Sequence, residues 1–430
     1  MFRAVLATVG SLWLLLGSTL GSCVPSATPD PVASKTARAE IAVFESFLKE
    51  PLCETLAVKY QLASDYVIAG DYQKTIALAA EVAQADQGFD FPLDREFKPL
   101  ATCPEFVKIA DSIHASHPPV QRSVAAFTVD DPRLIPEGLA YDERTQSFLM
   151  GSLNEKKIIR YSKEGMVSEF VSAERNGLSD VLGIRMDPRD GSVWVASGAD
   201  AAHAALFHFS PSGEFISKFR PPKGKSDHLF NDLVVCRDGA VFLTDSTANR
   251  VYTLPKGKTE VVPIRTPRRL YYPNGIALSP DEKTVFIADA FGVLAYERIS
   301  TPVGQHADTP IPAGIHPVQP GAHMTLSGFD GLYTWRDCLV GVQNSLGSPR
   351  IVVARLSDSR TEVTALTVLE YRTKYTQLPT TGALVGDTFY FITNSQIDHY
   401  RNGKLLNPEG LVPIVVAKVD LVEPSVGGTP

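Results

Sequence analysis

The sequence predicts a mainly β protein, a six-bladed β-propeller preceded by a small α-helical segment. One motif occurs six times: a short polar turn, an apolar strand, a second polar turn and another apolar strand. The copies are spaced about 43 to 56 residues apart, a period typical of the four-stranded blades that surround the central channel of a propeller. They begin at Pro136, Leu182, Asn231, Asn274, Asp330 and Thr381.

The overall composition is that of a globular protein with one large domain and a smaller one. The chain has 430 residues, 44% of them apolar, and a net charge of -7 at pH 7. An acidic chain gives no electrostatic reason to expect a nucleic acid or an anionic lipid surface as partner. The basic stretch Arg265, Arg268 and Arg269, beside Tyr271 and Tyr272, is interpreted as a solvated loop.

Residues 1–23 are predicted to be an export signal, because their apolar run is too short and ends too abruptly for a membrane span. The run closes on Leu-Gly-Ser-Cys23, which resembles the bacterial lipobox and implies that Cys23 is lipidated and becomes the mature N-terminus. Residues 24–36 are predicted to be a flexible linker. We expect a protein of the bacterial cell envelope that meets the membrane only through its lipid anchor. The alternative is ordinary signal cleavage and a soluble periplasmic or secreted protein.

Over residues 37–118 the apolar residues recur about every three and a half residues instead of every second residue, which predicts helices. The part around Gly70 resembles a tetratricopeptide unit, with the glycine at the turn between two helices. One such unit cannot bury its hydrophobic face unaided. It is therefore expected to pack on the propeller as a collar or to bind a partner protein. A bridge between Cys53 and Cys103 is possible in an exported protein.

The propeller is predicted to span residues 119–423, followed by a tail over 424–430. The late strand LVPIVVAKVDL could complete a blade with the early strand SVAAFTV, which would close the ring and leave no sheet edge free.

The turn that opens each repeat is expected to lie at one mouth of the central channel. The six residues there are Glu137, Gly183, Asn231, Asn274, Asp330 and Thr381. Four of them offer side-chain oxygen without sulfur or imidazole, a set that suits one Ca²⁺ better than Mg²⁺. We call Glu137, Asn231, Asn274 and Asp330 the ring residues and predict that they are calcium ligands.

A competing interpretation is that these pairs are ordinary tight turns, because Asn-Gly and Asp-Gly are common there. Their equivalent places in four repeats favour the metal. No Cys-x-x-Cys spacing, phosphate-binding loop, Gly-x-Ser-x-Gly elbow or His-Glu-x-x-His helix offers a competing chemistry in this sequence.

The stretches IPEGLAYDERTQSFLMGS, FNDLVVCRDGAVFLTD, YPNGIALSPDEKTVFIAD and GFDGLYTWRDCLVGV resemble the senescence marker protein, gluconolactonase and luciferin-regenerating enzyme-like family, over about residues 120–421. The resemblance implies a catalytic calcium at the channel mouth, held by the ring residues. It also implies that Asp330 is catalytic, as a base or as a nucleophile.

The sequence departs from the family's sugar lactonases, which place an arginine two residues before the Asn-Asp pair. Here that position is Leu229, and Phe230, Tyr271, Tyr272, Phe291 and Phe329 lie near the ring positions. A less polar lactone or ester is therefore expected, contacted by Asn231, Phe230 and Phe329. His228 and His323, which also lie close to ring residues, are interpreted as structural.

These observations predict a calcium-dependent hydrolase of a lactone or ester. Two alternatives stay open. One is a binding platform at the cell envelope with a structural calcium, because fold alone does not fix function. The other is a synthase-type propeller resembling strictosidine synthase, which needs no metal, and the complete set of ring residues argues against it.

Overall fold

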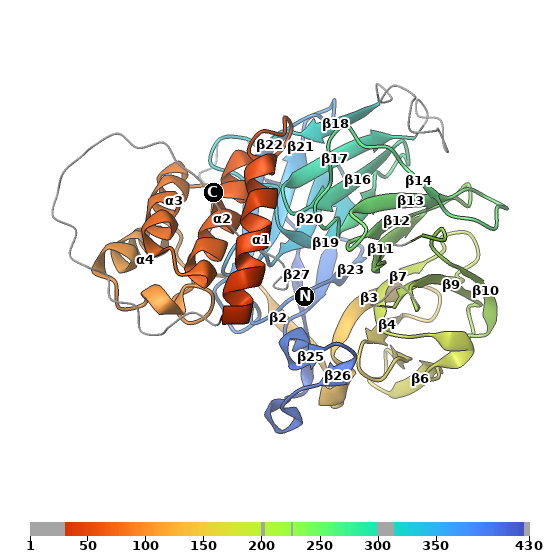
Figure 1. Ribbon diagram of the computed structural model, residues 1–430. Coiled ribbons are helices and arrows are strands. Elements are labelled where there is room, and N and C mark those ends of the chain that lie inside the picture. Colours follow the sequence, from red (N-terminus) through yellow and green to blue (C-terminus); the bar gives the residue numbers. More distant parts are fainter. Residues whose placement is uncertain (1–30, 199–202, 225–226, 299–313, 425–430) are drawn as a thin grey trace.

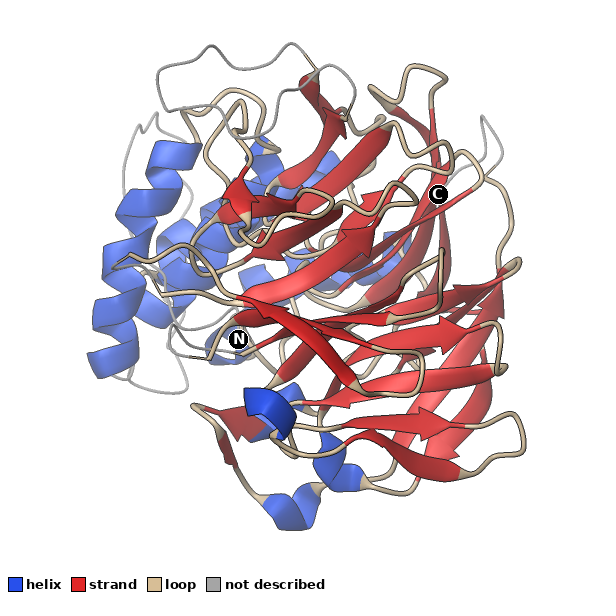
Figure 2. Ribbon diagram, turned by 90° about the vertical axis from the view of Figure 1, so that its right-hand side faces the viewer, coloured by secondary structure: helices blue, strands red, loops and turns tan. Residues whose placement is uncertain are grey.

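The computed structural model describes residues 31–198, 203–224, 227–298 and 314–424. The predicted signal, its lipobox at Cys23 and most of the predicted linker lie outside these ranges. The described chain forms a six-bladed propeller with a helical segment packed against one side of it (Figures 1 and 2). None of the helices in the described ranges is long and apolar enough to span a membrane.

Each blade is an antiparallel sheet of four main strands, and the first strand of each repeat lies next to the first strands of the neighbouring repeats. The predicted fold class is confirmed. Blade 1 consists of β3 (Pro136–Asp142), β4 (Ser147–Ser152), β5 (Ile158–Tyr161) and β6 (Val167–Val171). Blade 2 consists of β7 (Val181–Met186), β8 (Val193–Ser197), β9 (Ala205–Phe209) and β10 (Phe215–Phe219). Blade 3 consists of β11 (Phe230–Val235), β12 (Val241–Asp245), β13 (Arg250–Leu254) and β14 (Val262–Pro263). Blades 4 and 5 consist of β15 (Ile276–Leu278), β16 (Thr284–Asp289), β17 (Gly292–Glu297) and β18 (Ile315–Val318), then β19 (Phe329–Trp335), β20 (Cys338–Gln343), β21 (Arg350–Leu356) and β22 (Val363–Tyr371).

Blade 6 joins the two ends of the propeller chain. It contains β23 (Gly382–Val385), β24 (Thr388–Ile392), β27 (Ile414–Asp420) and the early strand β2 (Val124–Val129). Strand β2 pairs antiparallel with β27, with Val124 opposite Lys418, which confirms the closure expected from the sequence. The short strand β1 (Val120–Gln121) adds a fifth strand to blade 5. A hairpin of β25 (Tyr400–Arg401) and β26 (Lys404–Leu405) is inserted between β24 and β27.

In blades 1, 2, 3 and 5 the repeat motif forms a bulge at the start of the first strand. In blades 1, 3 and 5 the pairing with the second strand shifts register across Glu137, Asn231 and Asp330. Such bulges re-aim side chains next to functional sites. The glycine that follows has a packing role. A Cβ on Gly138 would lie 2.0 Å from the carbonyl oxygen of Leu182 in the next blade, so only glycine lets these inner strands approach.

The helical segment contains α1 (Pro31–Phe47), α2 (Thr55–Ala69), α3 (Tyr72–Ala85) and α4 (Pro104–Ser116). Helix α1 begins inside the predicted linker, earlier than the expected boundary at residue 37. The predicted turn at Gly70 is confirmed: this residue caps α2 with a left-handed φ of 83°. Asp71 then caps α3 by accepting a hydrogen bond from the backbone N–H of Lys74. Cys53 is a free thiol, so the possible bridge between Cys53 and Cys103 is not formed.

An aromatic cluster joins the helical segment to blade 4. Phe291, in the turn between β16 and β17, is fully buried and lies 4.8 Å from Phe47 and 5.5 Å from Phe44 of α1, measured between ring centroids. Tyr271 packs on the same rings and donates a hydrogen bond to Glu40. These contacts form one hydrophobic core that is continuous from the helices into the propeller. The first of the two expectations, packing against the propeller, is therefore met.

The basic stretch is part of this interface, which corrects its interpretation as a solvated loop. Arg268 is 4% exposed and forms a two-pronged ion pair with Asp289, at 2.5 and 2.7 Å. It also donates a hydrogen bond to the carbonyl oxygen of Leu52. Arg269 pairs with Glu50 at 2.8 Å. The charges of Arg268 and Arg269 are thus paired with acids of the propeller and of the helical segment, which local sequence composition does not reveal.

Asp65 of α2 is buried in the helical segment, and neither of its carboxylate oxygens has a hydrogen-bond partner among the described residues. Burial, together with the nearby charge of Glu40, raises the pKa of Asp65 well above its ordinary value. A carboxyl group with a raised folded-state pKa stabilises the fold below its unfolded pKa of about 3.9. That stabilisation is lost as the pH rises through the folded-state value.

We therefore expect Asp65→Asn to raise the free energy of unfolding at pH 8 by about 1 to 3 kcal/mol and to change it much less at pH 4. Urea denaturation at the two pH values measures the difference. Asp111→Asn, on the exposed surface of α4, is the control. An equal effect of Asp65→Asn at both pH values would contradict the assignment.

Candidate functional site

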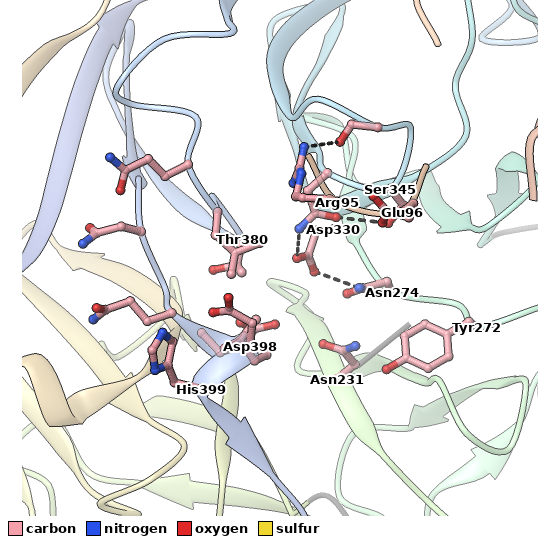
Figure 3. A pocket seen from close by; sticks show the side chains of 18 of the residues that line it. Arg95, Glu96, Asn231, Tyr272, Asn274, Asp330, Ser345, Thr380, Asp398 and His399 are labelled. Atoms are coloured by element: carbon pink, nitrogen blue, oxygen red, sulfur yellow. Dashed lines mark hydrogen bonds between the residues drawn. The ribbon is translucent and has the colours of Figure 1, made fainter. Parts of the chain in front are cut away.

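The four ring residues line one cavity of about 510 Å³, and Figure 3 labels Asn231, Asn274 and Asp330 in it. They come from four blades, with Glu137 on β3, Asn231 on β11, Asn274 just before β15, and Asp330 on β19. Each is only 5 to 6% exposed. The structure therefore brings together side chains that lie far apart in the sequence, as the repeat spacing predicts.

Asp330 is held by two amides. It accepts hydrogen bonds from Asn274 Nδ2 at 2.8 Å and from Asn344 Nδ2 at 2.5 Å, one on each carboxylate oxygen. Asn344 follows β20 and also donates to the carbonyl oxygen of Pro379. These bonds fix the plane of the carboxylate and leave some of its lone pairs directed elsewhere.

Several oxygens around the ring have no hydrogen-bond partner. Within the described ranges, Glu137 Oε2 and Asn274 Oδ1 are buried and unpaired. Asn231 uses its Nδ2 to donate to Ser246 at 2.9 Å, and this bond leaves its amide oxygen available to the cavity. Buried oxygens without a donor are costly unless something satisfies them. A hard cation does so, which is why this donor set fits Ca²⁺.

The acidic ring residues destabilise one another's charged forms. Burial, and then the negative charge of Asp330, holds the pKa of Glu137 well above its ordinary value. Burial raises the pKa of Asp330 to about 6, although the hydrogen bonds from Asn344 and Asn274 lower it. Among the described residues there is no cluster of three or more His, Cys, Asp or Glu that could hold a metal, so the candidate site consists of two carboxylates and neutral amides.

Arg185, on β7, pairs with Asp232 and, within the described ranges, not with either ring acid. Its guanidinium donates to Asp232 Oδ2 at 2.7 Å and lies 4.9 Å from the ring centroid of Tyr333. Asp232 follows Asn231 on β11, and its charge is therefore balanced by Arg185. Glu137 and Asp330 are left to be neutralised by a proton or by a cation.

Two walls that do not belong to the repeat motif complete the cavity. The helical segment contributes Tyr60, Gln61, Ser64 and Ile68 of α2, together with Arg95 and Glu96. Residues from Gln396 to Val412, around the inserted hairpin of blade 6, form the second wall. In Figure 3, Arg95 and Glu96 lie on one side of Asp330, and Asp398 and His399 lie on the other.

The structure places the predicted aromatic contacts elsewhere. Phe230 and Phe329 are 0 and 2% exposed and belong to hydrophobic cores between blades, not to the cavity wall. Their expected role in contacting substrate is corrected, because strand alternation directs them into the sheet packing. Phe291 and Tyr271 serve the helical interface. Of the five aromatic residues, only Tyr272 lines the cavity within the described ranges.

The two histidines near the ring residues in the sequence, His228 and His323, lie outside the cavity wall. His228 is buried and contacts Asp245, with 2.6 Å between its Nδ1 and Asp245 Oδ2, and His323 is exposed on a loop. Neither lines the cavity.

Asn344, Thr380 and His399 line the cavity but were not predicted from the sequence. Asn344 lies in the sequence VQNS that ends the repeat of blade 5, and the repeat of blade 6 ends in TNS at the equivalent place. This recurrence is a signal that could have identified Asn344.

A comparison with known protein families now adds to the geometry. Residues 135–300 match the family model described as SMP-30/Gluconolactonase/LRE-like region. The match begins just before Glu137 and includes Asn231 and Asn274, whereas Asp330 lies beyond it. No curated protein matches the chain.

The chain is also similar, at low sequence identity, to several solved structures. A gluconolactonase from Xanthomonas campestris is 16% identical over 72% of this chain and 92% of its own, with a TM-score of 0.46. A virginiamycin B lyase from Staphylococcus aureus is 14% identical over 69% of this chain and 98% of its own, with a TM-score of 0.46. A luciferin-regenerating enzyme is 16% identical over 69% of this chain and 95% of its own, with a TM-score of 0.45.

Proposed function

We propose that the protein is a calcium-dependent hydrolase of a lactone or ester and that the ring residues hold one Ca²⁺. The observation that carries this proposal is the convergence of four oxygen-bearing side chains on one cavity, with unpaired oxygens on Glu137 and Asn274. The family match supports lactonase chemistry as the class of reaction.

When bound, the ion would polarise the carbonyl of the substrate and favour the negative charge that develops on its oxygen. The protein's own residues have separate roles. Asn344 and Asn274 fix the carboxylate of Asp330, whose remaining lone pairs can accept a proton from water or attack the carbonyl carbon. Asn231, fixed by Ser246, directs its amide oxygen toward the cavity. The burial of these groups excludes bulk water and strengthens their electrostatic effect.

Chelation tests the proposal. We expect the purified protein to hydrolyse members of a panel of lactones and aryl esters, to lose this activity in excess EGTA, and to recover it with Ca²⁺ but not with Mg²⁺. Metal analysis of the native protein should find one calcium per chain.

The outcomes separate the candidate functions. Tightly bound calcium without turnover of any member of the panel would favour the non-catalytic platform. Hydrolysis that persists in chelator, with no metal found, would reject the calcium site.

A further inference from the structure

One face of α2 forms a wall of the cavity. Gln61, Ser64 and Ile68 lie three and four residues apart, so they share one side of the helix. All three line the same cavity as the ring residues. Because α2 is tied to α1 by the core that contains Phe291, its position relative to the ring is fixed by packing rather than by a flexible loop.

Ser64 is unusual for a helical serine. Its side chain is 7% exposed, and within the described ranges its hydroxyl makes no hydrogen bond. In α4, by contrast, Ser112 and Ser116 donate to the carbonyl oxygens of Ile109 and Ser112, at 2.7 and 2.8 Å. A hydroxyl normally bonds back in this way when nothing else is offered. The Ser64 hydroxyl therefore faces the cavity with its hydrogen-bonding capacity unused.

Gln61 extends the same polar face, and its amide too makes no hydrogen bond within the described residues. Two amides of the opposite wall already make hydrogen bonds to the backbone. Gln396 bonds in both directions to the backbone of Val412, and Asn394 bonds to the backbone of Pro413 and Val415. The α2 face thus supplies neutral donors and acceptors that Gln396 and Asn394 on the opposite wall do not offer.

We propose that Ser64 and Gln61 are specificity-determining residues that bind an uncharged, hydroxyl-bearing part of the ligand, while its lactone or ester group lies at the ring. This inference rests on the proposed function and names its substrate class. It replaces the less polar substrate expected from the sequence, because Phe230 and Phe329 lie in hydrophobic cores and not in the cavity wall. A cavity of about 510 Å³ falls within the range of pockets that hold drug-sized ligands. It leaves space beside the reacting group for an extension, such as a second sugar ring. The helical segment is then part of the binding site and not only a collar.

A matched pair of substrates tests this assignment. Cellobiono-1,5-lactone and δ-valerolactone share a six-membered lactone ring, but only the first carries a hydroxylated extension. For Ser64→Ala, and for the double variant with Gln61→Ala, we expect kcat/KM for cellobiono-1,5-lactone to fall about 3- to 10-fold per lost hydrogen bond, mainly through KM. We expect the value for δ-valerolactone to stay unchanged. Ser112→Ala, another helical serine, is the control and should affect neither substrate.

Binding of cellobionate, the stable ring-opened acid, separates this inference from the proposed function. In calorimetry with the calcium-saturated protein, the double variant should bind cellobionate at least about 10-fold more weakly than the wild type. Equal binding by variant and wild type, or no binding by either, would overturn the role of α2 even if hydrolysis requires calcium. Serine-dependent binding without any hydrolysis would retain that role and reject the hydrolase.

Discussion

Replacement of Asp330 by asparagine is expected to lower hydrolysis by about 10² to 10⁴-fold and to abolish stabilisation by calcium. The change keeps the size of the side chain but removes the charge that sits beside Glu137. It also places an NH₂ group where one of the donor amides, Asn274 or Asn344, now binds. A ligand at 100 times its Kd stabilises a protein by about 2.7 kcal/mol, and this increment should vanish in the variant.

Without metal, Asp330→Asn should not lower the stability of the protein. Glu137 and Asp330 are buried and repel each other when both are charged. Removing one charge relieves this repulsion, so metal-free Asp330→Asn should be at least as stable as metal-free wild type. A thermal melt with EGTA and with Ca²⁺ measures both effects.

Asp358→Asn, on the exposed turn between β21 and β22 of the same blade, is the matched control and should keep the calcium response. Two results would be decisive against the assignment. If Asp330→Asn retains full hydrolysis but loses the calcium response, Asp330 is a ligand without a catalytic role. If it retains both, the ring does not hold the metal.

The ring could be predicted because a propeller converts sequence repetition into spatial convergence. Equivalent positions in different blades must meet at the channel, so Glu137, Asn231, Asn274 and Asp330 could be grouped without knowledge of any contact. Three of the ring residues are followed by a glycine, and two of these glycines are required by the close approach of the neighbouring blade. Gly138 and Gly275 are needed because a backbone oxygen of the next blade would lie only 2.0 and 2.5 Å from a Cβ at these positions.

The walls of the cavity could not be predicted in this way. Gln61 and Ser64 belong to a segment outside the repeats, and their place over the channel depends on how α1 and α2 dock. The residues that join the helical segment to the propeller were misinterpreted from their local sequence. Tyr271 lies three residues before Asn274, as a substrate contact would, and Phe291 was also expected near the ring. Only the packed structure shows that both face α1. Arg268 looked solvated because its partner, Asp289, lies on another strand.

Phe291→Ala is expected to have the second large effect, a loss of stability at the interface between the helical segment and the propeller. Phe291 is fully buried among Phe44, Phe47 and Tyr271, and its carbonyl oxygen accepts a hydrogen bond from the backbone N–H of Glu54 at 3.0 Å. Loss of a buried phenylalanine side chain typically costs about 3 to 5 kcal/mol, because a cavity remains where the ring was.

We expect Phe291→Ala to destabilise the interface by that amount and to release α1 and α2 from the propeller before the blades unfold. Limited proteolysis should then cut the helical segment while the propeller stays intact, and urea denaturation should show an earlier first transition. Phe215→Ala is the control, since Phe215 is 37% exposed on the outer strand of blade 2 and should cost less than about 1 kcal/mol. Equal behaviour of the two variants would mean that the aromatic cluster does not hold the helices in place. The cavity wall formed by α2 would then depend on other contacts, of which the hydrogen bonds from Thr325 and Leu326 to Glu54 are the strongest candidates.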